Sequence, residues 1–430
     1  MTAEAPAQRS PTQRSRPTRR ALLGLAAATV TGAVAGSGCG RAATPPGPAR
    51  RPRASSGLTV SLPAPTGSHP IGTVDLHLVD RSRPDPLVPS KPYRELMISL
   101  WYPAVRRGRH AVAPWMSPRA AADWDRNSAP TLGVAPGTVD WAGIPTHARS
   151  AAPVARDAGQ LPIVLFAPGD GGTRSLGTTL VEDLASRGHL VLTVDHTYEA
   201  DQVEFPGGRV ERALPLPDEL TPQVIADLLV AHQRARVADM TYVLGLLGRL
   251  DRGHSPDADG TPLPDGLRGA LDLSAIGLLG QSLGGSVAAQ LAHDDERVGA
   301  AVDLDGGLFG TVARTGLAKP FLLLDREEHH RENEPTWTTF WAASTGWRRE
   351  VRFADAQHGS FSDLQAILPQ LGGHADRAVT AELIGTADPR RSIAAQRAYV
   401  TAFFDLHLKH RRTRFFDDAD AYPEGTRVVP

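Results

Sequence analysis

Residues 280–284 read Gly-Gln-Ser-Leu-Gly, a G-x-S-x-G pentapeptide. The preceding residues 275–279 are apolar and predict a short buried strand, whereas residues 285–292 are rich in small side chains and predict a helix. A strand that leads directly into a helix makes the pentapeptide a nucleophile elbow, a strained turn that lifts the Ser282 hydroxyl above the edge of a sheet. Glycine suits this turn because it lets backbone segments approach closely. The alternative is a glycine-rich turn whose serine has no chemical role.

The composition of the chain limits the classes of function. Its 430 residues are 41% hydrophobic and 22% charged, which is typical of a globular protein with one large α/β domain and appended segments. The formal net charge is −1, so we expect no nucleic-acid partner. The body of the chain holds no strongly apolar run long enough to cross a membrane. No protein partner is evident.

The N-terminal region predicts export. Four arginines cluster just before the Ala- and Leu-rich residues 21–28, namely Arg14, Arg16, Arg19 and Arg20. A basic start, a modest apolar core and then small residues describe an export signal over residues 1–38. Residues 18–23 (TRRALL) also resemble a twin-arginine signal. The alternative is a basic tail that is amphipathic or disordered.

The single cysteine follows this region. Cys39 stands where a bacterial lipobox places its acylated cysteine, although Gly36 is unusual where such sites carry Leu. Lipidation would tether the protein to the outer face of the cell membrane, and ordinary cleavage after residues 33–35 would release it outside the cell. One cysteine forms no internal disulfide. Residues 39–69 are rich in Pro and Ala and predict a linker.

Residues 70–430 predict one α/β domain. Residues 71–79 and 95–101 suggest an opening antiparallel pair of strands. Strand and helix patterns then alternate, with strands expected at 162–166, 189–194, 275–279, 299–304, 320–324 and 350–353, and helices at 176–187, 222–250, 285–292, 336–344 and 391–408. This order predicts right-handed crossovers and a mostly parallel sheet covered on both faces. The irregular, Pro- and Gly-rich segments 105–160 and 200–220 are expected to cap the site at the carboxyl ends of the strands.

A serine nucleophile needs a histidine as its base, and His358 is the best candidate. It follows the last predicted strand of the domain and is itself followed by Gly359 and Ser360. On this architecture the partners come in the order Ser, acid, His. His189 and His196 precede the serine, His293 lies in the helix after it, and His374 lies farther along the chain. His329 and His330 belong to the charged run 325–334, which we interpret as a solvated loop without a metal site.

Two aspartates are candidates for the acid that orients the histidine. Asp305 ends one predicted strand and Asp325 ends the next. Both would place a carboxylate at the carboxyl edge of the sheet, so the residues alone do not separate them.

An oxyanion hole needs two backbone N–H groups. The first belongs to Leu283, the residue after the nucleophile. Residues 166–172 (FAPGDGG) follow an earlier strand, and Asp170 or Gly171 would donate the second. The alternative is a plain glycine-rich turn.

Taken together, these stretches resemble the platelet-activating-factor acetylhydrolase family of the lipoprotein-associated phospholipase A2 type, whose bacterial members are often labelled secreted lipases. The resemblance is carried by the elbow and by residues 96–104, 166–169, 184–188, 194–200, 236–240, 304–306 and 358–363. It implies the α/β-hydrolase fold and maps the acid onto Asp305, the base onto His358, and the oxyanion donors onto Leu283 and Asp170. The chain departs from the family at Gln281 and Pro168, where His is common.

The resemblance also implies an activity. The family hydrolyses short or oxidised acyl chains at the sn-2 position of phospholipids, without metal or cofactor, so a small-molecule or lipid ester is the expected substrate. Candidates for an acyl pocket are Trp115, Trp124, Trp337 and Trp341, with core packing as the alternative for the last two. A peptidase or amidase that uses the same triad remains open, as does a surface lipoprotein that binds lipid or a partner through an inactive hydrolase fold.

Overall fold

The computed structural model describes residues 57–106, 108–417 and 426–429. The predicted export signal and Cys39 lie outside these residues. Within them, the main sheet has 11 strands in the order β13-β12-β11-β10-β9-β5-β6-β2-β1-β4-β3. Its parallel centre consists of β5 (Leu161–Ala167), β6 (Leu190–His196), β9 (Leu271–Gln281), β10 (Val298–Leu304), β11 (Phe321–Arg326) and β12 (Arg348–Phe353).

Every antiparallel pair of this sheet involves at least one strand outside this centre. The outer strands are β1 (Ile71–Asp80), β2 (Arg94–Pro103), β3 (Val112–Pro114), β4 (Pro145–Ser150) and β13 (Thr426–Val429). β2 joins the two parts because it pairs antiparallel with β6 on one side and with β1 on the other. The opening antiparallel pair expected from the sequence is therefore present. A separate two-stranded ribbon consists of β7 (Gln202–Glu204) and β8 (Val210–Arg212).

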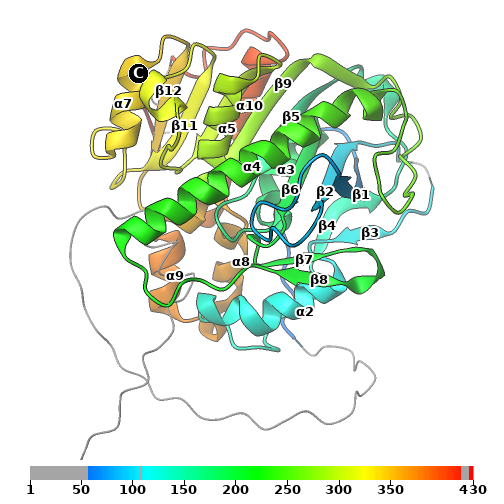
Figure 1. Ribbon diagram of the computed structural model, residues 1–430, viewed down its shortest axis with the longest axis horizontal. Helices are drawn as coiled ribbons and strands as arrows, with labels where there is room; N and C mark the ends of the chain where they lie inside the picture. Colours follow the sequence, from blue (N-terminus) through cyan, green and yellow to red (C-terminus); the bar gives the residue numbers. More distant parts are fainter. Residues whose placement is uncertain (1–56, 107, 418–425, 430) are drawn as a thin grey trace, which may run out of the picture.

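Helices cover both faces of the sheet, as the strand-helix alternation predicted (Figure 1). One face packs against α4 (Pro222–Asp251), α5 (Leu283–Asp294), α6 (Val312–Thr315) and α7 (Pro335–Ala343). The other packs against α3 (Thr178–Ser186) and α10 (Pro389–His407). Every residue of β5 and β6 is buried, and β5 is apolar along its whole length because both of its faces are covered. The fold is thus held by two hydrophobic layers, one on each side of the sheet.

The register of the parallel strands brings three loops to one edge. Ala167 at the end of β5 pairs with Gly280 of β9, and Gln281 pairs with Leu304 at the end of β10. The chain segments that follow these strands therefore emerge side by side at the carboxyl edge. This edge is where open α/β sheets carry their ligand sites.

Short elements gather at one end of the sheet and cover this edge (Figure 1). They are the β7–β8 ribbon, α2 (Pro118–Asn127), α8 (Leu364–Leu371) and α9 (Arg377–Ile384). The segments 105–160 and 200–220 were expected to be irregular, and they contain α2, β3, β4, β7 and β8. Three tryptophans stabilise this part, since the rings of Trp115, Trp124 and Trp141 lie with centroids 6.0–6.1 Å apart.

The predicted linker, residues 39–69, is too long at its C-terminal end. Val60 and Leu62 are buried against α8 and the tryptophan cluster, and Leu58 forms a β-bridge with Val139. The alternation of Leu58, Val60 and Leu62 is a strand-like signal that the surrounding prolines masked. Residues 57–69 therefore belong to the body of the domain. Among the described residues, no helix has the length and apolar character that a membrane crossing requires.

Candidate active site

Ser282 lies in a strained turn between β9 and α5. Its φ of +55° and ψ of −126° are unusual for a residue other than glycine. The backbone N–H of Ser282 donates to the carbonyl of Leu304, 2.8 Å away, which fixes the turn to the end of β10. A side chain at Gly284 would place its Cβ 2.0 Å from the Ala167 carbonyl oxygen, so only glycine fits there. The turn therefore has the strand, helix and close backbone approach of a nucleophile elbow.

Asp305 is the first residue after β10 and also has a positive φ, of 56°. Its Oδ2 lies 2.6 Å from Nδ1 of His358 and 2.9 Å from Nε of Arg326. Its Oδ1 lies 3.1 Å from Nδ1 of His329. Burial opposes ionisation, but hydrogen bonds from His329 and His358 and the positive charge of Arg326 hold the pKa of Asp305 below its usual value. The carboxyl is thus a carboxylate that accepts hydrogen bonds from two histidines and forms an ion pair with Arg326.

His358 begins the 3₁₀ turn His358–Phe361, at the same edge as the elbow. Because Nδ1 faces the Asp305 carboxylate, this nitrogen carries the proton and Nε2 is the acceptor. Nε2 lies 3.4 Å from the side-chain amide nitrogen of Gln281, the residue before Ser282. The imidazole therefore has the tautomer that a general base for a serine requires.

Asp325, the alternative acid, is still part of strand β11. The strand β11 continues to Arg326, so Asp325 is still paired within the sheet, opposite Arg352 of β12. Burial, followed by hydrogen bonding to Glu350, raises the pKa of Asp325 well above its usual value. Asp305 differs because it stands one residue beyond its strand in a left-handed conformation. The structure thus brings His358 to Asp305.

The interpretation of residues 325–334 as a solvated loop is wrong for His329. This side chain is only 9% exposed, and its ring lies 4.6 Å from that of Trp337. Its Nδ1 contacts Asp305, and its Nε2 lies 3.3 Å from Glu334. A bridge between Arg326 and His329 folds the segment back over Asp305. No sequence pattern signals the contact between His329 and Asp305, because these two residues are far apart in the chain and His329 is surrounded by charged residues.

We expect His329→Ala to lower kcat about tenfold with little change in KM, because Asp305 loses one charge-assisted donor and its carboxylate becomes less fixed. Steady-state kinetics on p-nitrophenyl acetate measures this effect. His330→Ala is the matched control, since His330 contacts Glu332 rather than Asp305. Equal activity of the two variants would contradict a role for His329.

The loop after β5 lies against Ser282. A Cβ at Gly169 would lie 3.1 Å from the Ser282 Cβ, so the loop passes directly beside the elbow. Arg236 of α4 donates to the carbonyls of Pro168 and Gly169, with Nη2 2.8 Å from the Gly169 oxygen. Leu283 is the first residue of α5, and the first N–H groups of a helix have no partner within it. Asp170 and Leu283, the predicted oxyanion donors, thus lie on segments that flank Ser282.

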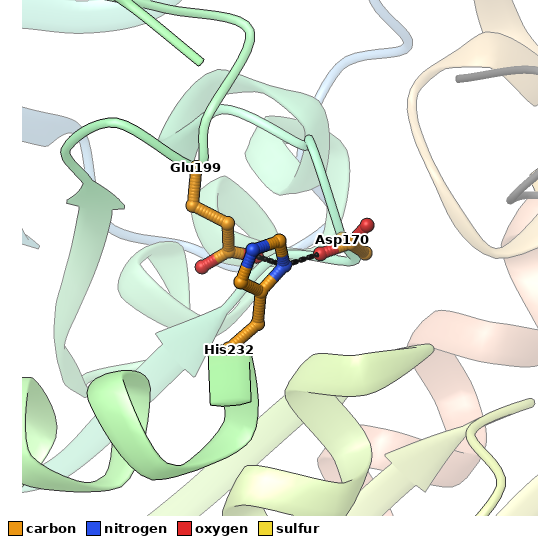
Figure 2. A group of neighbouring side chains, drawn as sticks. All are labelled: Asp170, Glu199 and His232. Carbon is orange, nitrogen blue, oxygen red and sulfur yellow. Dashed lines mark hydrogen bonds and ion pairs between the residues drawn. The ribbon is translucent and has the colours of Figure 1, made fainter. Parts of the chain in front are cut away.

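The Asp170 side chain belongs to a buried group that sequence reasoning missed. Figure 2 shows His232 of α4 between Asp170 and Glu199. His232 Nδ1 lies 2.7 Å from Asp170 and 3.7 Å from Glu199. Burial raises the pKa of Asp170. The hydrogen bond and the charge of His232 lower this pKa by more, so it falls below the usual value. His232 and Arg236 lie one helical turn apart, a pattern that marks one face of α4.

Two groups of side chains in the described part of the chain have the donor atoms that a metal ion needs. Asp170, Glu199 and His232 form one, and His330, Glu332 and Glu350 form the other. Both are already ion-paired with arginines, because Glu199 binds Arg236, and Glu350 binds Arg331 and Arg352. The arginines neutralise the carboxylates that would hold a cation, so the residues fit an ion-pair network better than a metal centre.

A cavity of about 650 Å³ opens over the site. Gln281 and His358 line its base. Its apolar lining includes Trp124, Leu132, Leu176, Leu214, Leu216 and Leu383, and its polar lining includes Asn127, Ser128, Thr131, Asp201, Arg212 and Glu382. Of the four tryptophans expected at an acyl pocket, Trp124 lines this cavity. Trp337 lies beneath the site and donates to the Gly306 carbonyl, and Trp115 and Trp341 pack in the core. The cavity can hold a ligand of moderate size.

Comparison with known proteins assigns the chain to a family. The family described as "Platelet-activating factor acetylhydrolase, isoform II" matches residues 56–427. The chain belongs to this family. The resemblance inferred from the sequence is therefore confirmed.

Two named proteins are similar to this chain over part of their length. "Probable 1-alkyl-2-acetylglycerophosphocholine esterase" of Arthroderma benhamiae is 30% identical over 264 residues, 58% of this chain and 61% of that protein. "Platelet-activating factor acetylhydrolase" of Bos taurus is 23% identical over 281 residues, 61% of this chain and 60% of that protein. The chain thus spans about 60% of the length of these relatives.

A solved structure is similar over a larger share. The ferulic acid esterase of Streptomyces cinnamoneus superposes with a TM-score of 0.71 at 36% identity. The match covers 87% of this chain and 100% of that one. The α/β-hydrolase fold expected from the sequence is confirmed.

Proposed function

We propose that this member of the acetylhydrolase family is a serine hydrolase of carboxylic esters. The observation that carries the proposal is the 2.6 Å contact between Asp305 and His358 at the edge where Ser282 occupies its strained turn. Ser282 is the nucleophile, His358 the base and Asp305 the residue that orients the imidazole. Family membership and the names of the relatives support the same reaction class.

In the acylation step, Ser282 Oγ attacks the ester carbonyl while His358 Nε2 takes its proton. Gln281 now contacts this nitrogen, so its amide moves aside as substrate enters. The N–H groups of Leu283 and Asp170 hold the oxyanion. The intermediate collapses, the bond to the alcohol breaks, and His358 returns its proton to the leaving oxygen.

The second step consumes one water. His358 removes a proton from this water, whose oxygen attacks the acyl carbon attached to Ser282. Collapse of the second tetrahedral intermediate releases the carboxylic acid and returns the proton to Ser282. Asp305 remains ionised throughout and stabilises the imidazolium, for which its lowered pKa suits it.

The substrate we propose is an ester of a short or aromatic acyl group. The names of the relatives specify an acetyl ester of a glycerophosphocholine and an ester of ferulic acid. The cavity is large enough for either acyl group and combines apolar with polar lining. Turnover of p-nitrophenyl acetate, butyrate and palmitate, of methyl ferulate and of a 2-acetyl glycerophosphocholine ranks these classes. Cleavage of a peptide or amide panel without turnover of any ester would contradict the proposal.

An exposed leucine at the cavity supplies a test of the acyl pocket. Leu214 is 40% exposed although it is apolar, and its backbone is held by a bond to the Tyr198 carbonyl. We expect Leu214→Ser to lower kcat/KM for p-nitrophenyl butyrate about fivefold, since apolar contact with the acyl chain is lost. Leu273→Ser is the control, because Leu273 is equally exposed on β9 but does not line the cavity. A loss shared by both variants would contradict this role for Leu214.

We also propose that the protein is exported, and that it is either anchored through lipidated Cys39 or released after ordinary cleavage. The basic, then apolar, then small-residue order of residues 1–38 supports export, and the position of the cysteine supports acylation. The mass of the mature N-terminus, determined from cell envelope and medium, tests both. A lipid-modified Cys39 as first residue would show anchoring, and cleavage after residues 33–35 would show release. An unprocessed N-terminus in the cytoplasm would contradict export.

A further inference from the structure

The second proposed oxyanion donor is an aspartate. A carboxylate in this position would repel the transition state, because negative charge develops on the substrate oxygen that the Asp170 N–H would hold. The loop can serve only if its peptide points toward Ser282 and the Asp170 side chain is turned away and neutralised. Two residues of α4 contact the loop in the way that these requirements demand.

Arg236 fixes the direction of the peptide. Its guanidinium is fully buried, donates to the carbonyls of Pro168 and Gly169, and is itself held by Glu199, with Nε 2.6 Å from the carboxylate. The Gly169 carbonyl and the Asp170 N–H belong to one planar trans peptide and point in opposite directions. Since Arg236 holds the carbonyl, the Asp170 N–H faces away from α4.

His232 pairs with the charge of the Asp170 carboxylate. Its Nδ1 lies 2.7 Å from the Asp170 carboxylate, and the charged groups around the imidazole are Asp170, Glu199 and Arg236. Burial opposes protonation, but the hydrogen bond with Asp170 and the charge of Glu199 outweigh it and raise the pKa of His232 above its usual value. The contact with His232 therefore turns the carboxylate toward α4, and the raised pKa of the imidazole favours the protonated form that balances the charge of Asp170 (Figure 2).

We propose that His232 and Arg236 are positioning residues for the oxyanion hole, Arg236 by orienting the Asp170 peptide and His232 by neutralising the Asp170 carboxylate. The inference rests on the proposed function and extends it to residues that do not touch the substrate. It differs from a merely structural role because it makes the effect of losing His232 depend on the charge of Asp170.

A double-mutant cycle tests this dependence. The kcat and KM for p-nitrophenyl acetate are measured for the wild type, His232→Phe, Asp170→Asn and the double variant. We expect His232→Phe to lower kcat about tenfold with KM changed less than about twofold, because the unpaired carboxylate opposes the oxyanion. The double variant should recover at least about fivefold of this loss, since it removes the charge. A double variant no better than His232→Phe would overturn the proposal.

Further variants separate folding from positioning. Arg234→Ala is the matched control on the exposed side of α4 and should equal the wild type. If His232→Phe does not fold, His232→Asn keeps a donor but loses the charge, and its loss of kcat should again be reversed by Asp170→Asn. Arg236→Lys cannot bridge both carbonyls and Glu199, so its kcat should fall about tenfold while a fluorophosphonate still labels Ser282.

The pH profile gives a readout that packing alone would not change. Activity of the wild type should fall on the alkaline side as His232 loses its proton, and this limb should be absent from the double variant.

If dialysis against EDTA abolishes activity and a divalent metal restores it, the three side chains Asp170, Glu199 and His232 hold a cation and the ion-pair account is wrong. If the wild type turns over ester and His232→Phe equals it, this inference alone fails. A wild type without turnover or Ser282 labelling would defeat the proposed function as well.

Discussion

Replacing Ser282 with alanine is expected to lower kcat for ester hydrolysis about 10⁵-fold, because no other group can form the acyl-enzyme. The fold should persist, since the bonds that fix the turn come from its backbone N–H and carbonyl. A combined Ser282→Ala and His358→Ala variant should lose little more than either single one, because nucleophile and base act as a unit.

Ser274→Ala is the matched control for this prediction. Ser274 lies at the opposite, exposed end of β9, where its hydroxyl bonds to Asp272. Its substitution should leave kcat within about twofold of the wild type. Retention of substantial activity by Ser282→Ala, in protein free of contaminating esterase, would contradict the assignment of the nucleophile.

Replacing Asp305 with asparagine is expected to lower kcat about 10⁴-fold. The asparagine amide would donate to Nδ1 of His358 and stabilise the tautomer whose Nε2 carries the proton, so the base could not accept the proton of Ser282. It would also leave Arg326 and His329 facing a neutral group where they now face a carboxylate.

Asp325→Asn tests the alternative acid directly. Burial and the neighbouring Glu350 raise the pKa of Asp325 well above its usual value, which favours the neutral carboxyl that asparagine imitates in shape and polarity. We therefore expect kcat within about threefold of the wild type. A larger loss for Asp325→Asn than for Asp305→Asn would reverse the assignment of the acid.

Much of the fold could be predicted because its signals are local. The strand before Ser282 and the helix after it are marked by an apolar run, two glycines and a series of small residues, and both are present. The strand β5 is recognisable because it is buried on both faces and apolar throughout. The short elements that cover the site were not recognised, since strands of three residues such as β7 carry little pattern.

The contacts of the site needed the structure because they join residues far apart in the chain. Asp305 and Asp325 both follow apolar runs, and only the register shows that one has left its strand while the other is still paired. His329 was taken for a solvated residue because its neighbours are charged. His232 lies in a helix that shows no catalytic motif, although its spacing from Arg236 could have suggested a buried polar face.

The central claim is that Ser282 is a nucleophile activated by His358 and Asp305. Its most direct test is peptide mapping by mass spectrometry after reaction with a fluorophosphonate, with hydrolysis of p-nitrophenyl acetate followed in the same sample. We expect one adduct per chain, located on Ser282, with turnover lost in proportion to labelling and labelling strongly slowed in Asp305→Asn. Turnover that persists without an adduct on Ser282, or an adduct on another residue that accounts for the lost turnover, would contradict the account.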